Sequence, residues 1–178
     1  MLKTDSFVVE DAVEIALEAQ TELVQAFNES GVDVIAVADP TSSPELLDPN
    51  DFSEFAQPAL EDLSAEMETE SILHICGNSR PILEEMLDCG FSGISVEEAV
   101  DMTEAQQVRA ETGAETVMVG NVSTSQTLFS KPVEEVKAEV TQALEKGVNV
   151  LAPSCGIAPK SPLANLKAFV EARDEFYQ

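Results

Sequence analysis

The distribution of hydrophobic and polar residues predicts strands that alternate with helices. Short apolar runs, rich in Val and Ile or nearly continuous in apolar residues, recur from residue 33 onward, as is typical of buried parallel strands. We expect five strands, at residues 33–38, 71–75, 93–96, 116–119 and 148–152. Each is followed by a turn rich in Pro, Gly, Asn or Ser and then by an amphipathic segment. The pattern predicts an α/β fold built from repeated βα units.

The amphipathic segments predict six helices, at residues 9–28, 52–68, 80–89, 98–112, 133–146 and 163–176. Several of these segments end in glycine, as at Gly90, Gly113 and Gly147, where a left-handed residue commonly terminates a helix. Pro132 and Pro162 lie near the first turns of the last two segments, where proline is tolerated. The boundaries are therefore supported by local stereochemistry as well as by periodicity.

Composition limits the classes of partner. The chain has 178 residues, of which 44% are hydrophobic, enough for one domain with a core, and we treat residues 1–178 as a single domain. Nine basic residues against 34 acidic ones give a net charge of −25, which argues against nucleic acid or an anionic membrane as a partner. The acidic residues are spread over helix faces, which predicts a solvated surface suited to high salt.

Targeting and cysteine signals point to a cytoplasmic protein. The sequence begins with no charged segment followed by an apolar one, and it has no run of about 18 apolar residues that could span a bilayer. It contains three cysteines, an odd number, which fits reduced thiols or a metal site better than a disulfide framework. We expect Cys89, at the end of a predicted helix, to be a packing residue.

The single histidine and the other two cysteines predict a zinc site. His74 and Cys76 close the second predicted strand, and Cys155 follows the fifth. Residues i and i+2 of a strand share a face, so His74 and Cys76 can hold one ion together while Cys155 approaches from another strand. One nitrogen and two sulfurs leave a fourth position of a tetrahedral zinc open, as in catalytic sites.

Other polar residues also follow predicted strands. Asp39, Glu97 and Asn121 come after the first, third and fourth strands, and the carboxyl ends of parallel strands form one rim, where ligands bind in α/β proteins. Asp39 and Asn121 are candidates for substrate binding. Asp39 before Pro40 equally fits a turn and helix cap, and Asn121 beside Gly120 has a turn interpretation, which is the one favoured by local sequence.

With these residues in place, the chain resembles the C-terminal half of the uroporphyrinogen decarboxylase superfamily. Within it, the chain resembles the methylcobamide:coenzyme M methyltransferases of methylotrophic methanogens. It rests on Val34-Ile35-Ala36-Val37-Ala38-Asp39-Pro40, His74-Ile75-Cys76-Gly77-Asn78, Gly120-Asn121-Val122 and Ala152-Pro153-Ser154-Cys155-Gly156-Ile157-Ala158-Pro159. The His-x-Cys pair with a distant Cys-Gly marks the zinc-dependent, thiol-methylating branch, whereas the other segments mark only the superfamily.

The resemblance implies a (β/α)8 barrel with zinc held by His74, Cys76 and Cys155. It also implies that Glu97 occupies the fourth position until substrate displaces it, with the neighbouring Glu98 as the alternative. The implied reaction transfers a methyl group from methylcobalamin, carried by a partner corrinoid protein, to the thiol of coenzyme M. Two cysteinates on the zinc would keep the incoming sulfur anionic and nucleophilic.

A closed barrel of this type needs eight strands and typically about 250 residues. The predicted strands correspond to the last five βα units, so the chain is a partial (β/α)8 barrel that lacks the first three strands. Three interpretations follow: a fragment of an interrupted gene, one half of a split enzyme completed by a separate amino-terminal polypeptide, or a subunit that closes with a second copy. The last would give ten strands and is the least favoured.

Two other functions remain alternatives. A uroporphyrinogen decarboxylase-type enzyme must bind several carboxylates and therefore needs arginines in its pocket, but Arg80, Arg109 and Arg173 all fall on predicted helices. The other alternative is an inactive barrel fragment or accessory subunit. Zinc content would distinguish the methyltransferase from the decarboxylase.

Overall fold

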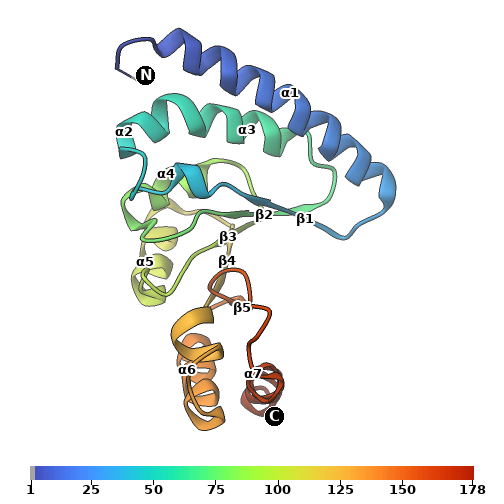
Figure 1. Ribbon diagram of the computed structural model, residues 1–178, viewed down its shortest axis with the longest axis vertical. Coiled ribbons are helices and arrows are strands. Elements are labelled where there is room, and N and C mark those ends of the chain that lie inside the picture. The colour runs from blue at the N-terminus through green and yellow to red at the C-terminus, as the bar shows by residue number, and fades with distance from the viewer. Residues whose placement is uncertain (1–2) are drawn as a thin grey trace.

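The computed structural model describes residues 3–178, in which parallel strands alternate with helices (Figure 1). The strands are β1 (Val34–Ala38), β2 (Glu70–His74), β3 (Gly93–Ser95), β4 (Val117–Val122) and β5 (Val150–Pro153). The α-helices are α1 (Ser6–Ser30), α2 (Pro49–Asp51), α3 (Gln57–Ala65), α4 (Leu83–Asp88), α5 (Met102–Thr112), α6 (Val133–Glu145) and α7 (Leu163–Phe176). Short 3-10 helices (Pro40–Ser42, Arg80–Ile82) and π-helical turns (Phe52–Ala56, Thr124–Leu128) complete the described elements.

The sheet has five strands in the order β1-β2-β3-β4-β5, and every neighbouring pair is parallel. Strands that are consecutive in the chain are therefore adjacent in space, as in a singly wound barrel rather than a doubly wound sheet. The order and the α/β class confirm the prediction, and the sheet is an open section of a (β/α)8 barrel. Its two edges within the described residues are β1 and β5.

The two faces of the sheet are buried to different extents. Leu73, Ile94 and Met118 lie in register on neighbouring strands and are 0% exposed, because the helices cover this face. On the other face, Val34 at the β1 edge is 48% exposed and Val150 at the β5 edge is 43% exposed. The helix-covered face therefore holds the main core, and the opposite face is open at both edges.

The helices pack against their neighbours in chain order. Helix α1 runs beside α3 above β1 and β2, while α6 and α7 lie together below β5 (Figure 1). The buried amide of Asn165 at the start of α7 donates to the carbonyl oxygens of Leu128 and Lys131 at 3.0 and 2.8 Å. These bonds hold α7 against the segment that follows β4. No helix among residues 3–178 is long and apolar enough to cross a membrane.

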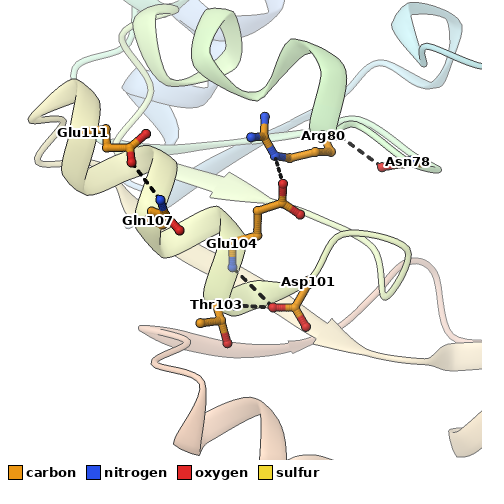
Figure 2. Close-up of polar contacts among 7 residues, drawn as sticks. All are labelled: Asn78, Arg80, Asp101, Thr103, Glu104, Gln107 and Glu111. Carbon is orange, nitrogen blue, oxygen red and sulfur yellow. Dashed lines mark hydrogen bonds and ion pairs between the residues drawn. The ribbon is translucent and has the colours of Figure 1, made fainter.

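Several predicted boundaries differ from the observed ones. Helix α5 begins at Met102 rather than at residue 98, because the Asp101 carboxylate accepts hydrogen bonds from the Thr103 and Glu104 amides and caps the helix (Figure 2). The predicted helix at 52–68 is divided into a π-helical turn and α3. Strand β4 extends to Val122, so Asn121 lies inside the strand and not after it. The predicted glycine stops are correct, as for Gly113 with φ of 72°.

We predict that Leu73→Ala lowers the free energy of unfolding by about 2–5 kcal/mol, because it leaves a cavity in the core. Val34→Ala serves as the control and should change stability by about 0.5 kcal/mol or less, because the Val34 side chain is 48% exposed. Urea denaturation followed by circular dichroism measures both values. An equally large loss for Val34→Ala would show that this side chain is covered in solution.

Candidate metal centre

The carboxyl ends of three strands bring four potential metal ligands together. His74 is the last residue of β2, Cys76 lies two residues further on, Glu97 lies two residues after β3, and Cys155 lies two residues after β5. One donor atom from each residue lies within 4.8 Å of the other three. The structure thus places together the three predicted ligands and the predicted fourth one, although Cys76 and Cys155 are 79 residues apart.

The separations between donor atoms fit a single tetrahedral ion. The sulfurs of Cys76 and Cys155 are 3.8 Å apart, and the Cys76 sulfur is 3.4 Å from His74 Nε2. With usual zinc bond lengths, a tetrahedral site requires about 3.8 Å between two sulfurs and about 3.6 Å between sulfur and nitrogen. The nitrogen and sulfur donors fit zinc in type as well as in spacing.

His74 is oriented by a neighbouring strand. Its Nδ1 lies 3.2 Å from both the carbonyl oxygen and the hydroxyl of Ser95, the residue opposite it in the β2–β3 register. When Nδ1 carries the proton and donates to the Ser95 carbonyl, Nε2 presents its lone pair toward the two cysteines. Metal-binding histidines commonly have such a second hydrogen bond. Ser95 was not identified from the sequence, because strand register is not readable from the hydrophobic pattern.

The electrostatics of the cluster favour a cation. Burial, which is the largest cause, and the neighbouring Cys155 and Glu97 together raise the pKa of the Cys76 thiol to about 11. Removing the proton from Cys76 would place an anion beside other acidic groups, at a cost that a positive ion offsets. The donor types and charges of the cluster therefore fit a bound metal ion.

The side chains of Asn121 and Asp39 form hydrogen bonds to the backbone of loops at this end of the sheet. The Asn121 amide donates to the carbonyl oxygens of Glu97 and Val100 at 3.2 and 2.9 Å, so it fixes the loop that carries Glu97. Asp39 caps the 3-10 helix Pro40–Ser42 and accepts hydrogen bonds from the Thr41 and Ser42 amides, both at 3.2 Å. The cap interpretation of Asp39 is confirmed, whereas the turn interpretation of Asn121 is wrong, because Asn121 lies within β4. Their binding of substrate remains a prediction.

Glu98 has a hydrogen-bond partner outside the four-residue cluster. Its Oε1 accepts a hydrogen bond from the Ser123 hydroxyl at 2.6 Å. Burial alone would raise the pKa of Glu98, but hydrogen bonds from Ser123 and Ser154 and from its own backbone outweigh that effect and lower it. Of the two adjacent carboxylates, the structure places Glu97 in the cluster and gives Glu98 a different set of partners.

The remaining cysteine is a packing residue, as predicted. Cys89 is 0% exposed, and its thiol donates to the Glu85 carbonyl at 3.2 Å. Burial raises its pKa to about 12, with Glu61, Asp88 and Glu85 contributing in the same direction. A buried, protonated thiol of this kind is a poor metal ligand and a poor nucleophile.

The three arginines bind other surface groups. Arg80, in the segment after Cys76, forms a 2.7 Å ion pair with Glu104 on α5 (Figure 2). Arg109 donates to the Gln106 side chain, and Arg173 pairs with Asp174. Within residues 3–178 the cluster thus lacks the group of arginines that binding of several carboxylates would require.

Two curated relatives match nearly all of this chain. The methylcobamide:CoM methyltransferase MtaA of Methanosarcina barkeri is 48% identical over 176 residues, covering 98% of this chain and 50% of the relative. MtbA of Methanosarcina acetivorans, also a methylcobamide:CoM methyltransferase, is 30% identical over 178 residues, covering 98% of this chain and 51% of the relative. The chain thus spans about half the length of these relatives.

A solved structure, described as a methyltransferase from Methanosarcina mazei, superposes with a TM-score of 0.90 at 48% identity. The match covers 95% of this chain and 50% of that one. The family model for uroporphyrinogen decarboxylase (URO-D) matches residues 1–176. The chain therefore belongs to the uroporphyrinogen decarboxylase (URO-D) family.

Proposed function

We propose that this chain forms the metal-binding half of a zinc-dependent methyltransferase. In the proposed reaction, a methyl group passes from a methylated corrinoid, carried by a partner protein, to the thiol of coenzyme M. The observation that carries the proposal is the convergence of one imidazole, two thiols and a carboxylate within 4.8 Å. The relatives described as methylcobamide:CoM methyltransferases support the choice of substrates. We place the reaction in the cytoplasm, where such thiols stay reduced.

The residues of the cluster have distinct roles in this mechanism. A zinc ion bound here would lower the pKa of a substrate thiol and keep it as a thiolate at neutral pH. Cys76 and Cys155 supply negative charge, which keeps the substrate sulfur electron-rich, and Ser95 holds His74 in the orientation required of a ligand. Glu97, the oxygen donor of the four-residue cluster, would complete the ligand set of a zinc ion in the absence of a substrate thiol. The thiolate then attacks the methyl carbon, and the bonding electron pair leaves with the corrinoid.

The rest of the barrel is also part of the proposal. A mostly apolar groove of about 660 Å³ runs between α1, α3 and the open edge of β1. Helix α1 presents Ile15 (68% exposed), Leu23 (48%) and Phe27 (40%) at its surface. A parallel strand and a helix would cover these side chains and the unpaired edge. Because the matched relatives are about twice as long, we propose that the amino-terminal half of the barrel fills this groove.

The zinc proposal predicts a specific pattern among variants. The 178-residue chain, purified in high potassium chloride to screen its net charge of −25, should bind one zinc ion. His74→Ala and Cys76→Ala should lose the zinc ion. Their zinc affinity should fall by more than about 100-fold, because losing a ligand costs more than losing a residue that only hydrogen-bonds to a ligand. Cys89→Ala is the matched control and should keep its zinc, measured by atomic emission. Loss of zinc from Cys89→Ala but not from Cys76→Ala would refute the ligand set.

The raised pKa of Cys76 predicts a dependence of zinc affinity on pH. The group titrates near 11, so below that pH zinc must displace its proton. The loss of this one proton should therefore make the zinc affinity increase by about tenfold for each pH unit between about pH 6 and about pH 8. Competition with a chelator measures the slope, and Cys89→Ala should reproduce it. A slope of zero would show that neither Cys76 nor Cys155 binds zinc as a thiolate.

The proposed activity can be tested by reconstitution. The chain, with and without a polypeptide matching the amino-terminal half of the relatives, is mixed with methylcobalamin and coenzyme M, and loss of methylcobalamin is followed by absorbance. We expect turnover only with both halves present, together with co-elution of the halves in size-exclusion chromatography. A stable, zinc-loaded monomer that is fully active alone would disprove the need for the second half, and a homodimer would assign the groove to a second copy.

A further inference from the structure

The carboxylate of the metal cluster is carried by a loop that has no regular structure of its own. Strand β3 ends at Ser95, and the Val96 amide still donates to the Val119 carbonyl of β4 at 3.1 Å. Residues 97–101 then form neither helix nor strand. Because strand pairing does not extend to Glu97, contacts from neighbouring elements must set the position of its backbone.

One side chain of β4 bonds to both ends of the turn that begins at Glu97. Within this turn the Val100 amide donates to the Glu97 carbonyl at 3.0 Å. The Asn121 amide donates to the same Glu97 carbonyl at 3.2 Å and to the Val100 carbonyl at 2.9 Å. A primary amide has two N–H groups, so these two bonds use its full donor capacity.

The residues on both sides of Glu97 also contact the end of β4. A Cβ atom at Gly120, whose φ is 140°, would lie only 2.7 Å from the Val96 carbonyl oxygen, so glycine is what allows the strand to approach this closely. On the other side of Glu97, the Glu98 carboxylate accepts a hydrogen bond from the Ser123 hydroxyl at 2.6 Å. The backbone of three consecutive residues is thus held against β4.

We propose that Asn121 is a positioning residue that holds the Glu97 carboxylate at ligand distance from the metal. This inference rests on the zinc site proposed above. Asn121 acts through the Glu97 backbone and contacts the metal neither directly nor through its own oxygen in this role. Fixing the backbone of Glu97 narrows the positions that its flexible side chain samples, so less conformational entropy is lost when the carboxylate binds an ion.

The test compares Asn121→Ala, Glu97→Gln and the double variant of the 178-residue chain. The matched control is Asn165→Ala, because the Asn165 amide also donates to two backbone carbonyls, those of Leu128 and Lys131 at 3.0 and 2.8 Å, but has no bond to the loop that carries Glu97. Zinc affinity is measured by competition with a chelator. Cobalt(II) is then substituted for zinc, and its visible absorption reports which groups surround the metal.

Asn121→Ala should weaken zinc binding by about tenfold relative to Asn165→Ala. In the Glu97→Gln background the same substitution should change the affinity by less than about twofold, because its effect passes through the carboxylate that is already lost. The cobalt spectrum of Asn121→Ala should shift toward that of Glu97→Gln, whereas Asn165→Ala should keep the wild-type spectrum. A general loss of stability would not produce this pattern.

An equal loss of affinity on Asn121→Ala in the wild-type and Glu97→Gln backgrounds would overturn the proposal, as would a wild-type cobalt spectrum for Asn121→Ala. In either case the metal site itself stands. If the wild-type chain binds no zinc, the positioning role and the proposed function both fail. Should Asn121→Ala not fold, Asn121→Leu takes its place, because leucine keeps the branched shape without N–H donors, and the same outcomes decide.

Discussion

Parallel pairing in register is the constraint on which the rest of the structure depends. Each strand of the sheet pairs with the next one along the chain, so every loop that leaves a strand end emerges at the same rim. Residues as distant in sequence as Cys76 and Cys155 therefore meet within 3.8 Å. The helix-covered face fixes this register through fully buried side chains such as Leu73 and Ile94. A slip of one residue would turn these side chains away from the core and move the ligands apart.

The metal centre and the core place opposite demands on the chain. The core requires continuous apolar strands, whereas the rim gathers thiols and carboxylates that disfavour one another's ionised forms. The raised pKa of Cys76 expresses this conflict directly. Both requirements are met at the strand ends, where the chain leaves the sheet and polar side chains can form hydrogen bonds. The contact between His74 and the Ser95 carbonyl oxygen is an example. The same end of the sheet thus combines rigidity from the strands with chemistry from the loops.

Much of this arrangement was predictable from the sequence, and the exceptions have physical reasons. The five strands, their parallel order and the grouping of His74, Cys76 and Cys155 follow from apolar runs and from residues placed directly after them. The start of α5 was predicted too early in the chain. The first residue of this helix is set by the hydrogen bonds of the Asp101 cap, which hydrophobic periodicity does not detect. The role of Ser95 could not be predicted, because it depends on which residues face each other across strands. Hydrophobic patterns identify strands but do not determine these cross-strand neighbours.

The open edge at β5 has a thermodynamic consequence. Three donors of the candidate metal cluster follow strands with two neighbours, but Cys155 follows β5, which pairs only with β4 among residues 3–178. Any element that clamps β5 from its unpaired side narrows the range of positions that Cys155 can sample and so tightens the hold on the ion. By reciprocity, a bound ion must strengthen that clamping by the same factor. In the proposed enzyme, metal uptake and closure of the barrel would in this way be two linked equilibria.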